Sequence, residues 1–245
     1  MATLYSPKIV TDGLVLCLDA ANVKSYTGTG TTWSDLSGNS RNVSLVNGPT
    51  FVTASRGAIN LDGTNDHMLG TVAGSLPSGT TSFTLSIWIY FNTNISGNFS
   101  FPAGQYGAVI FSGNSNGTME FIIQPIPSGS IGPPGRIALA RYGGGTTGTC
   151  EALNVNMPIQ TWHNLVLVRD GIASQKIYLN GQLIGTGNVS NSFTAGNLYI
   201  GGAPADSFFT GYVNGRIANV QNYNRALSAD EVLQNYNALS ARYGV

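Results

Sequence analysis

Apolar and polar residues alternate in short runs along this chain, and clusters of Gly, Asn, Ser and Pro separate the runs. The clearest run is Phe83–Phe91, in which every odd-numbered residue is apolar. Successive side chains of a strand point to opposite faces, so this alternation predicts a strand with one face in the core. The residues that we expect to be buried on that face are Phe83, Leu85, Ile87, Ile89 and Phe91.

Other runs predict further strands. Residues 14–19 place Leu14, Leu16 and Leu18 on one face. The run Trp162–Arg169 is apolar on both faces, which is typical of a central strand, and we expect Leu165 and Leu167 to be buried. The dipeptide Asn180-Gly181 predicts a hairpin, because it tolerates the positive φ angles of a type I′ turn. The remaining expected strands are Ala58–Asp62, Leu198–Ile200 and Tyr212–Val220, and the expected loops are Trp33–Gly48, 92–117 and Gln124–Gly135.

The spacing of apolar residues changes near the C-terminus from the alternation of strands to a helical period. The sequence there predicts a short amphipathic helix over residues 228–241. Ser228 and Glu231 form a capping box, in which each side chain satisfies a free backbone amide of the other. One apolar stripe contains Val232, Leu233, Tyr236 and Leu239, and we expect it to dock on the strands. The less favoured alternative is a partner-binding role, with Arg242 and Tyr243 extending outward.

Composition narrows the class of protein. Charged residues make up 9% of the chain and the formal net charge is zero, so we expect no nucleic acid and no anionic membrane as partner. No apolar run has the length of a signal peptide or of a membrane span, which predicts synthesis in the cytoplasm and no membrane insertion. The two cysteines cannot form a disulfide framework, and we expect Cys17 to be a buried free thiol, while Cys150 lies beside a Gly/Thr loop.

Many short strands and one helix predict an all-β fold, an antiparallel two-sheet jelly-roll sandwich with a short C-terminal α-helix. We expect a single domain over residues 1–245, with residues 1–12 as an N-terminal arm. Trp33, Trp88 and Trp162 each lie in or beside an expected strand. We therefore expect them to pack within the sandwich rather than to serve as sugar platforms.

Nine sequence blocks resemble, in order, those of the laminin-G-like, concanavalin-A-like jelly-roll domains, of the type found in tailed bacteriophages and environmental bacteria. The blocks are Gly13–Asn22, Thr32–Asn39, Asn47–Phe51, Leu61–His67, Phe83–Ile89, Trp162–Val168, Ile177–Gly181, Leu198–Gly202 and Tyr223–Ser228. The family often carries an acidic pair where this chain has Ala218-Asn219, which argues against a calcium site built from those two positions. The resemblance implies the fold, but one fold hosts many functions.

Some relatives of this fold are glycoside hydrolases, which need a pair of carboxylates as nucleophile and acid. The chain has three glutamates, Glu120, Glu151 and Glu231, and none has a second carboxylate at the spacing that one strand would require. Asp230 and Glu231 are adjacent but belong to the helix cap. We therefore expect no enzymatic activity. His163 falls in a buried strand and is expected to be a core histidine.

Asp62, Asn65 and Asp66 lie close together just before His67. Carboxylate and carbonyl oxygens suit a hard cation such as Ca²⁺, so these three residues are candidate metal ligands. The alternative is a network of Asx turns, because Asp-Gly and Asn-Asp favour turns. No other cofactor is expected.

Two functions fit these observations, and a glycoside hydrolase is a distant third. The first is a non-enzymatic phage virion protein, a capsid decoration or a tail- or fibre-associated module, that binds other virion proteins and host surface glycans, as a monomer or an oligomer. The second is a secreted or cell-surface bacterial carbohydrate-binding module. Aromatic residues in the expected loops are the candidate binding residues, because aromatic anchors ringed by small polar residues are typical of contact surfaces. They are Phe99, Phe101, Tyr106, Phe208 and Phe209; the alternative is that these rings cover the edge of the sandwich.

Overall fold

The computed structural model describes residues 7–53, 56–75, 79–92, 108–112, 119–125, 135–141, 150–155, 157–171, 174–188, 196–202 and 212–245, with residues 108–112, 119–125, 135–141 and 151–154 described by their backbone. The described strands are β1 (Leu14–Asp19), β2 (Thr32–Trp33), β3 (Val43–Val46), β4 (Thr50–Val52), β5 (Ala58–Asp62), β6 (His67–Gly70), β7 (Phe83–Phe91), β8 (Ala108–Ser112), β9 (Met119–Pro125), β10 (Gly135–Arg141), β11 (Cys150–Val155), β12 (Trp162–Asp170), β13 (Ser174–Leu179), β14 (Gln182–Gly187), β15 (Leu198–Ile200) and β16 (Asn214–Tyr223). The helix α1 spans Ala229–Tyr243.

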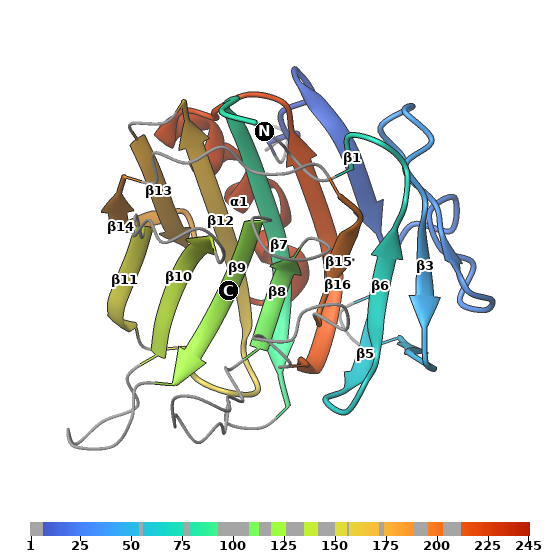
Figure 1. Cartoon of the computed structure of the whole chain (residues 1–245). Coiled ribbons are helices and arrows are strands. Elements are labelled where there is room, and N and C mark those ends of the chain that lie inside the picture. The colour runs from blue at the N-terminus through green and yellow to red at the C-terminus, as the bar shows by residue number, and fades with distance from the viewer. Residues whose placement is uncertain are drawn as a thin grey trace, which may run out of the picture.

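The strands form two antiparallel layers. The front layer runs β2-β3-β6-β15-β8-β9-β10-β11, and the back layer runs β14-β13-β12-β7-β16-β5-β4, with β1 also paired to β16. Figure 1 shows β8, β9 and β10 in front of β12, β7 and β16, with α1 behind the back layer. The short pairing of β11 with β14 joins the layers along one side. The predicted all-β jelly-roll sandwich with a C-terminal helix is confirmed.

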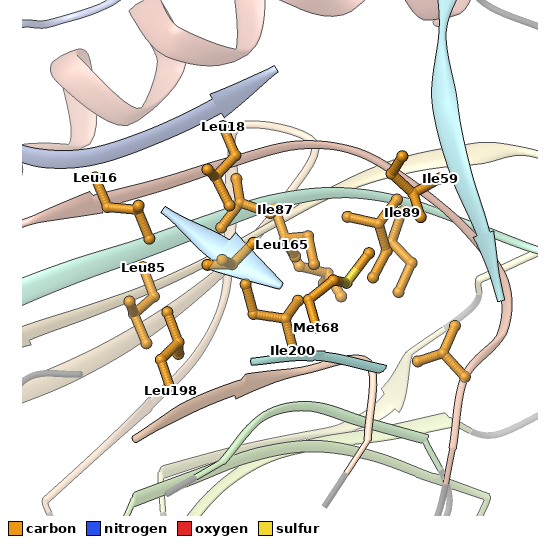
Figure 2. Close-up of a cluster of buried hydrophobic side chains, with 14 of the residues drawn as sticks. Leu16, Leu18, Ile59, Met68, Leu85, Ile87, Ile89, Leu165, Leu198 and Ile200 are labelled. Carbon is orange, nitrogen blue, oxygen red and sulfur yellow. The ribbon is translucent and has the colours of Figure 1, made fainter. Parts of the chain in front are cut away.

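The main core lies between the two layers. Strand β7 contributes its odd-numbered residues, and β12 contributes Leu165 and Leu167, all at most 2% exposed. Met68 and Ile200 reach the same core from the front layer, as Figure 2 shows. The burial predicted from the alternation in β7 and β12 is therefore confirmed. The burial of these residues follows from the position of β7 in the sheet. β7 pairs with β12 on one side and β16 on the other, and both neighbours present apolar residues to the same face.

Strand β1 departs from the predicted alternation. Leu16 and Leu18 are buried in the main core, but Leu14 packs with Tyr223 and Leu227 in a second cluster. The register between β1 and β16 shifts between Leu14 and Leu16. Such a bulge turns the residues before it to the other face of the strand. The expectation that all three leucines share one face is thus wrong.

The helix starts as predicted and ends later. Ser228 accepts a hydrogen bond from the Glu231 amide, and Glu231 accepts one from the Ser228 amide, which confirms the capping box. The buried helix residues are Val232, Asn235 and Tyr243. Leu233, which was expected in the docking stripe, is instead 43% exposed. None of the helical segments that the structure describes has the length and hydropathy to span a bilayer.

Tyr243 packs against the back layer and does not extend outward. Its ring stacks on Trp88 with the centroids 4.2 Å apart and lies 4.8 Å from the ring centroid of Trp162. Arg242 forms an ion pair with Asp19 at 2.9 Å. The last helical turn is therefore fixed on the outer face of the back layer, and the expected packing role of Trp88 and Trp162 is confirmed. Trp33 is buried in the core between the layers, also as predicted.

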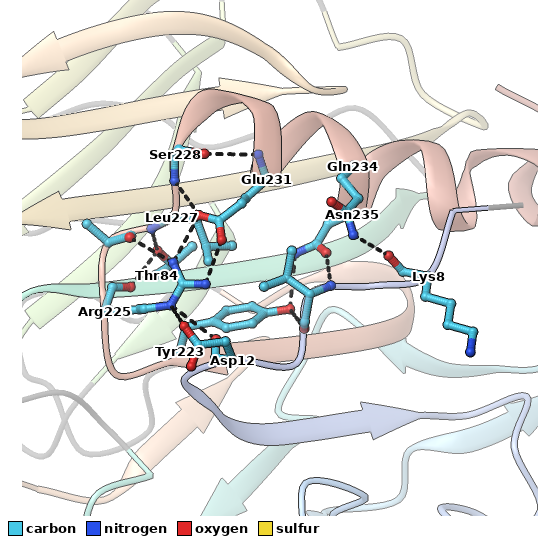
Figure 3. A network of polar contacts seen from close by, with 12 residues as sticks. Lys8, Asp12, Thr84, Tyr223, Arg225, Leu227, Ser228, Glu231, Gln234 and Asn235 are labelled. Atoms are coloured by element: carbon cyan, nitrogen blue, oxygen red, sulfur yellow. Dashed lines mark hydrogen bonds and ion pairs between the residues drawn. The ribbon is translucent and has the colours of Figure 1, made fainter.

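Polar contacts fix residues 8–12 and the start of α1 (Figure 3). Asn235 accepts a hydrogen bond from the Val10 amide at 2.7 Å and donates one to the Tyr223 hydroxyl at 3.0 Å. Arg225 forms ion pairs with Asp12 and Glu231. These contacts tie residues 10–12 and the start of α1 to the end of β16 and the residues that follow it.

Several strands were not predicted. β3 lies within Trp33–Gly48 and β8 lies within 92–117, both of which were expected to be loops, so those expectations are wrong. These strands are short and flanked by Gly, Asn and Ser, and they form through pairing with distant partners such as β6 and β15. The hairpin at Asn180-Gly181 is confirmed, with φ angles of 51° and 79°.

Candidate functional site

The two layers meet at one end of the sandwich, which we call the rim and define as residues 62–67, 92, 200–202 and 212–214. The amide of Asn92, at the end of β7, donates to the Asn214 carbonyl at 3.1 Å. The Val213 amide donates to the Gly201 carbonyl at 2.9 Å. The segments 93–107 and 203–211 begin at these anchored positions, so the rim is where both are attached to the sandwich.

The turn between β5 and β6 forms part of the rim. The Asp62 carboxylate accepts a hydrogen bond from the Thr64 amide at 2.7 Å, and the Asp66 carboxylate accepts one from the Asp62 amide at 3.0 Å. The Asn65 carbonyl accepts one from the Asn47 side chain at 2.9 Å. The Thr64 hydrogen bond lowers the pKa of Asp62, whereas burial raises the pKa of Asp66. These hydrogen bonds are those of the Asx-turn alternative.

Asp62, Asn65 and Asp66, the candidate metal ligands, do lie in one five-residue turn. Each carboxylate already accepts a backbone amide, and no group of three or more His, Cys, Asp or Glu side chains able to hold a metal occurs among the described residues. A Ca²⁺ ion would have to use the remaining carboxylate oxygens and carbonyl groups of the turn. The turn thus has a structural role without an ion, and the calcium site stays a prediction.

His67 packs rather than faces a ligand. Its Nδ1 lies 2.9 Å from the Asn65 carbonyl oxygen, and its ring lies 5.8 Å from Tyr199 and 6.2 Å from Tyr212, centroid to centroid. A Cβ atom at Gly202 would lie 2.4 Å from Tyr212, so glycine is required there. The sequence analysis did not single out either tyrosine, although each lies in or beside an expected strand.

The outer face of the back layer also reaches the rim. A row of directly paired residues crosses this face, and we call it the outer row: Trp162, Tyr90, Arg216, Asn60 and Thr50. The Arg216 guanidinium lies over the Tyr90 ring, 4.8 Å from its centroid. The Asn92 side-chain amide donates to the side-chain oxygens of Asn60, at 3.3 Å, and Asn214, at 3.1 Å. The sequence analysis missed Arg216, because only the pairing of three strands places it beside Tyr90.

The predicted aromatic binding residues, Phe99, Phe101, Tyr106, Phe208 and Phe209, lie outside the described residues. Their role therefore stays a prediction. The segments that contain them are attached at the rim, next to Asn92 and Gly202.

Carboxylates with described side chains mostly serve the fold. Those that accept hydrogen bonds or form ion pairs are Asp12, Asp19, Asp35, Asp62, Asp66, Asp170 and Glu231. Glu120 and Glu151 lie in β9 and β11, the strands that flank β10, opposite Ala140 and Ala138. Their backbones are thus separated by two strand spacings across the sheet, roughly 10 Å, and by two residues along β10, roughly 7 Å. The spacing of the two glutamates in the sequence does not show that their strands lie on either side of β10.

Neither described thiol nor His163 has the surroundings of a reactive group. Cys17 is a free and buried thiol, as predicted, and Cys150 is buried. Burial, together with the nearby Asp19 and Asp35, raises the pKa of the Cys17 thiol to about 12. Burial lowers the pKa of His163, whose Nε2 lies 2.9 Å from the Pro158 carbonyl. His163 is a buried histidine of the core strand, as predicted.

This geometry defines a class of protein, the two-layer antiparallel sandwich. A family model described as the concanavalin A-like lectin/glucanases superfamily matches residues 62–233. The match covers more than half of the chain, so the protein belongs to this superfamily, and the resemblance to laminin-G-like domains is confirmed. No curated protein matches the chain in sequence.

Solved structures share the fold at low identity. Domain 4 of AbnA, a GH43 extracellular arabinanase from Geobacillus stearothermophilus, was solved in complex with arabinotriose; it has a TM-score of 0.63 and 15% identity, covering 91% of this chain and 98% of that one. The binding domain of botulinum neurotoxin DC, in complex with SialylT, has a TM-score of 0.65 and 15% identity over 94% of this chain and 52% of that one. The binding domain of Paraclostridial Mosquitocidal Protein 1 has a TM-score of 0.63 and 18% identity, with coverages of 93% and 52%. The chain therefore spans about half the length of the two toxin domains.

Proposed function

We propose that this protein is a non-catalytic binding module that attaches to polysaccharide through its rim. The observation that carries the proposal is that strand ends of both layers meet at the rim, where two long segments with aromatic residues begin. Loops held on a rigid scaffold are the usual place for recognition. The arabinanase domain supports the proposal, because it shares the fold over nearly its full length and was solved with an oligosaccharide.

We base the proposal that the module is non-catalytic on the positions and contacts of its carboxylates. Glycoside hydrolysis needs two carboxyl groups about 5 to 10 Å apart that are free to act as nucleophile, acid or base. Seven of the carboxylates are held by hydrogen bonds or ion pairs that stabilise turns, strands and the helix cap. Glu120 and Glu151, on the two strands that flank β10, are the pair of the described strands that we would test for an enzymatic role.

We further propose that the module is a virion component, a capsid decoration or a tail- or fibre-associated protein that also binds other virion proteins. The resemblance of the nine sequence blocks to phage domains and the near absence of net charge support this setting. A secreted bacterial carbohydrate-binding module is the alternative. Purification of the native source particle separates the two, because a virion protein fractionates with the particle and a secreted module does not.

The test of the proposed function is replacement of Phe208 and Phe209 together by Ser. Both lie in the segment that starts at the rim, and we expect the variant to keep its melting temperature but to lose retention on polysaccharide and incorporation into particles. Val23→Ser is the control, because Val23 is an apolar side chain that is 75% exposed. A large drop in melting temperature, with attachment unchanged once the variant is folded, would assign the two rings to packing and refute the proposal.

A further inference from the structure

Arg216 lies in the middle of the outer row without a polar partner. None of the hydrogen bonds and ion pairs of the described residues involves its guanidinium, and its Nε is buried without a hydrogen-bond partner. The other two arginines near β16 differ, because Arg225 pairs with Asp12 and Glu231, and Arg242 pairs with Asp19. Arg216 thus carries a positive charge that no carboxylate of the described chain neutralises.

The surroundings hold the Arg216 guanidinium in place. It lies over the Tyr90 ring at 4.8 Å, and the Tyr90 ring is supported by Trp162 at 5.5 Å, centroid to centroid. A cation over an aromatic face is attracted by the ring quadrupole, and stacking limits the rotamers of a long side chain. The guanidinium is therefore oriented before any ligand binds, which lowers the entropy cost of binding.

The row also supplies neutral polar groups next to this charge. Asn60 and Thr50 continue it on the side of Arg216 away from Tyr90. Tyr90, Arg216 and Asn60 are half-buried, and Thr50 is exposed. Asn92 holds the Asn60 side chain through its amide, so the Asn60 side chain has a fixed position. The result is a half-exposed strip with an aromatic ring, a fixed cation and short hydrogen-bonding side chains.

We infer that the outer row binds an acidic polysaccharide, with the Arg216 guanidinium paired to the carboxylate of a uronic acid residue. The planar guanidinium matches a carboxylate with two parallel hydrogen bonds, and the Nη groups remain available for them. The short polar side chains of Asn60 and Thr50 are suited to sugar hydroxyls. This inference rests on the proposed function and adds a ligand class and a specific residue to it.

The test uses polygalacturonate, alginate and hyaluronate, each beside its carboxyl-reduced neutral form. Affinity electrophoresis of the whole chain should show that at least one acidic polymer binds about tenfold more tightly than its neutral form, the size expected of one charge-assisted pair. Arg216→Gln should lose this preference, while Arg216→Lys, which keeps the charge but not the planar fork, should retain part of it. Lys24→Gln removes an equal charge from an exposed loop and should bind as the unchanged protein does.

The outcomes separate this inference from the proposed function. Equal binding of acidic and neutral polymers, or an Arg216→Gln variant that keeps the preference, overturns the role of Arg216 and leaves the binding module intact. Failure of the unchanged protein to bind any of the six polymers, or any other polysaccharide tried, overturns both. A melting temperature of Arg216→Gln close to that of the unchanged protein confirms that the loss of preference does not come from unfolding.

Discussion

Trp88 and Tyr90 lie two residues apart on the same face of β7, yet their surroundings differ. Trp88 is 1% exposed and stacks with Tyr236 and Tyr243 of the helix. Tyr90 is half-buried, and its ring is covered by Arg216 from the neighbouring strand. The helix ends at Tyr243, and Gly244 caps it in the left-handed conformation with a φ of 74°.

This difference separates the part of the sheet face that stabilises the fold from the part that we propose for recognition. Where α1 covers the face, aromatic rings and ion pairs are used to hold the helix. Toward the rim the same face carries a cation, amides and a hydroxyl, which a stable core would not place there without partners. The end of the helix therefore marks the boundary between packing and the proposed binding surface.

The largest effect should come from the core side of the same strand. Ile87 is fully buried between the layers, and Ile87→Ala should lower the free energy of unfolding by about 2 to 5 kcal/mol, through lost transfer energy and a residual cavity. Urea denaturation measures this loss. Leu183→Ala is the control, since Leu183 is 51% exposed and its truncation should cost far less. A loss below about half a kcal/mol for Ile87→Ala would mean that the register of β7 is wrong.

A smaller effect, with a defined pH dependence, should come from the start of the helix. Hydrogen bonds from Arg225 and from the Ser228 amide lower the pKa of Glu231 from 4.5 to about 2. A carboxylate with a lowered pKa in the folded state stabilises the fold above its unfolded pKa and ceases to do so as the pH falls through the folded value. Glu231→Gln should therefore cost about 1 kcal/mol at pH 7, because the half-exposed pair is partly screened by solvent.

The difference between the unchanged protein and Glu231→Gln should shrink as the pH falls from about 4.5 to about 2. Stability at a series of pH values, measured by thermal unfolding, gives the answer. Asp230→Asn, in the same helical turn but exposed, should show a smaller change at pH 7. A Glu231→Gln difference that is constant from neutral pH to pH 2.5 would rule out the charge of Glu231 as its source.

Short sequence patterns predicted those elements of the fold whose physical cause lies within a few residues. The alternation in β7, the Asn180-Gly181 turn and the Ser228 capping box each have a physical cause within a few residues, and all three are confirmed. The strand β8 and the bulge that turns Leu14 away from the main core depend on pairing with β15 and β16, which are distant in sequence. No pattern within a short window contains that information.

The same limit applies to the candidate site. The turn at Asp62, Asn65 and Asp66 was visible because its residues are neighbours in sequence. The sequence did not indicate Arg216 as a candidate, because Tyr90, Asn60 and Arg216 meet only when β5, β7 and β16 pair. The packing of Tyr243 was not predicted either, since nothing in a helical period shows that Trp88 and Trp162 lie beneath it.

The most direct test of the account measures binding and hydrolysis in one incubation. The protein is mixed with a polysaccharide that retains it, and both the bound fraction and the release of reducing ends are followed. We predict retention without product, because seven of the described carboxylates hold the fold and no catalytic pair is assigned. Sustained release of reducing ends that is abolished in the double variant Glu120→Gln, Glu151→Gln would contradict this account and make the protein a hydrolase.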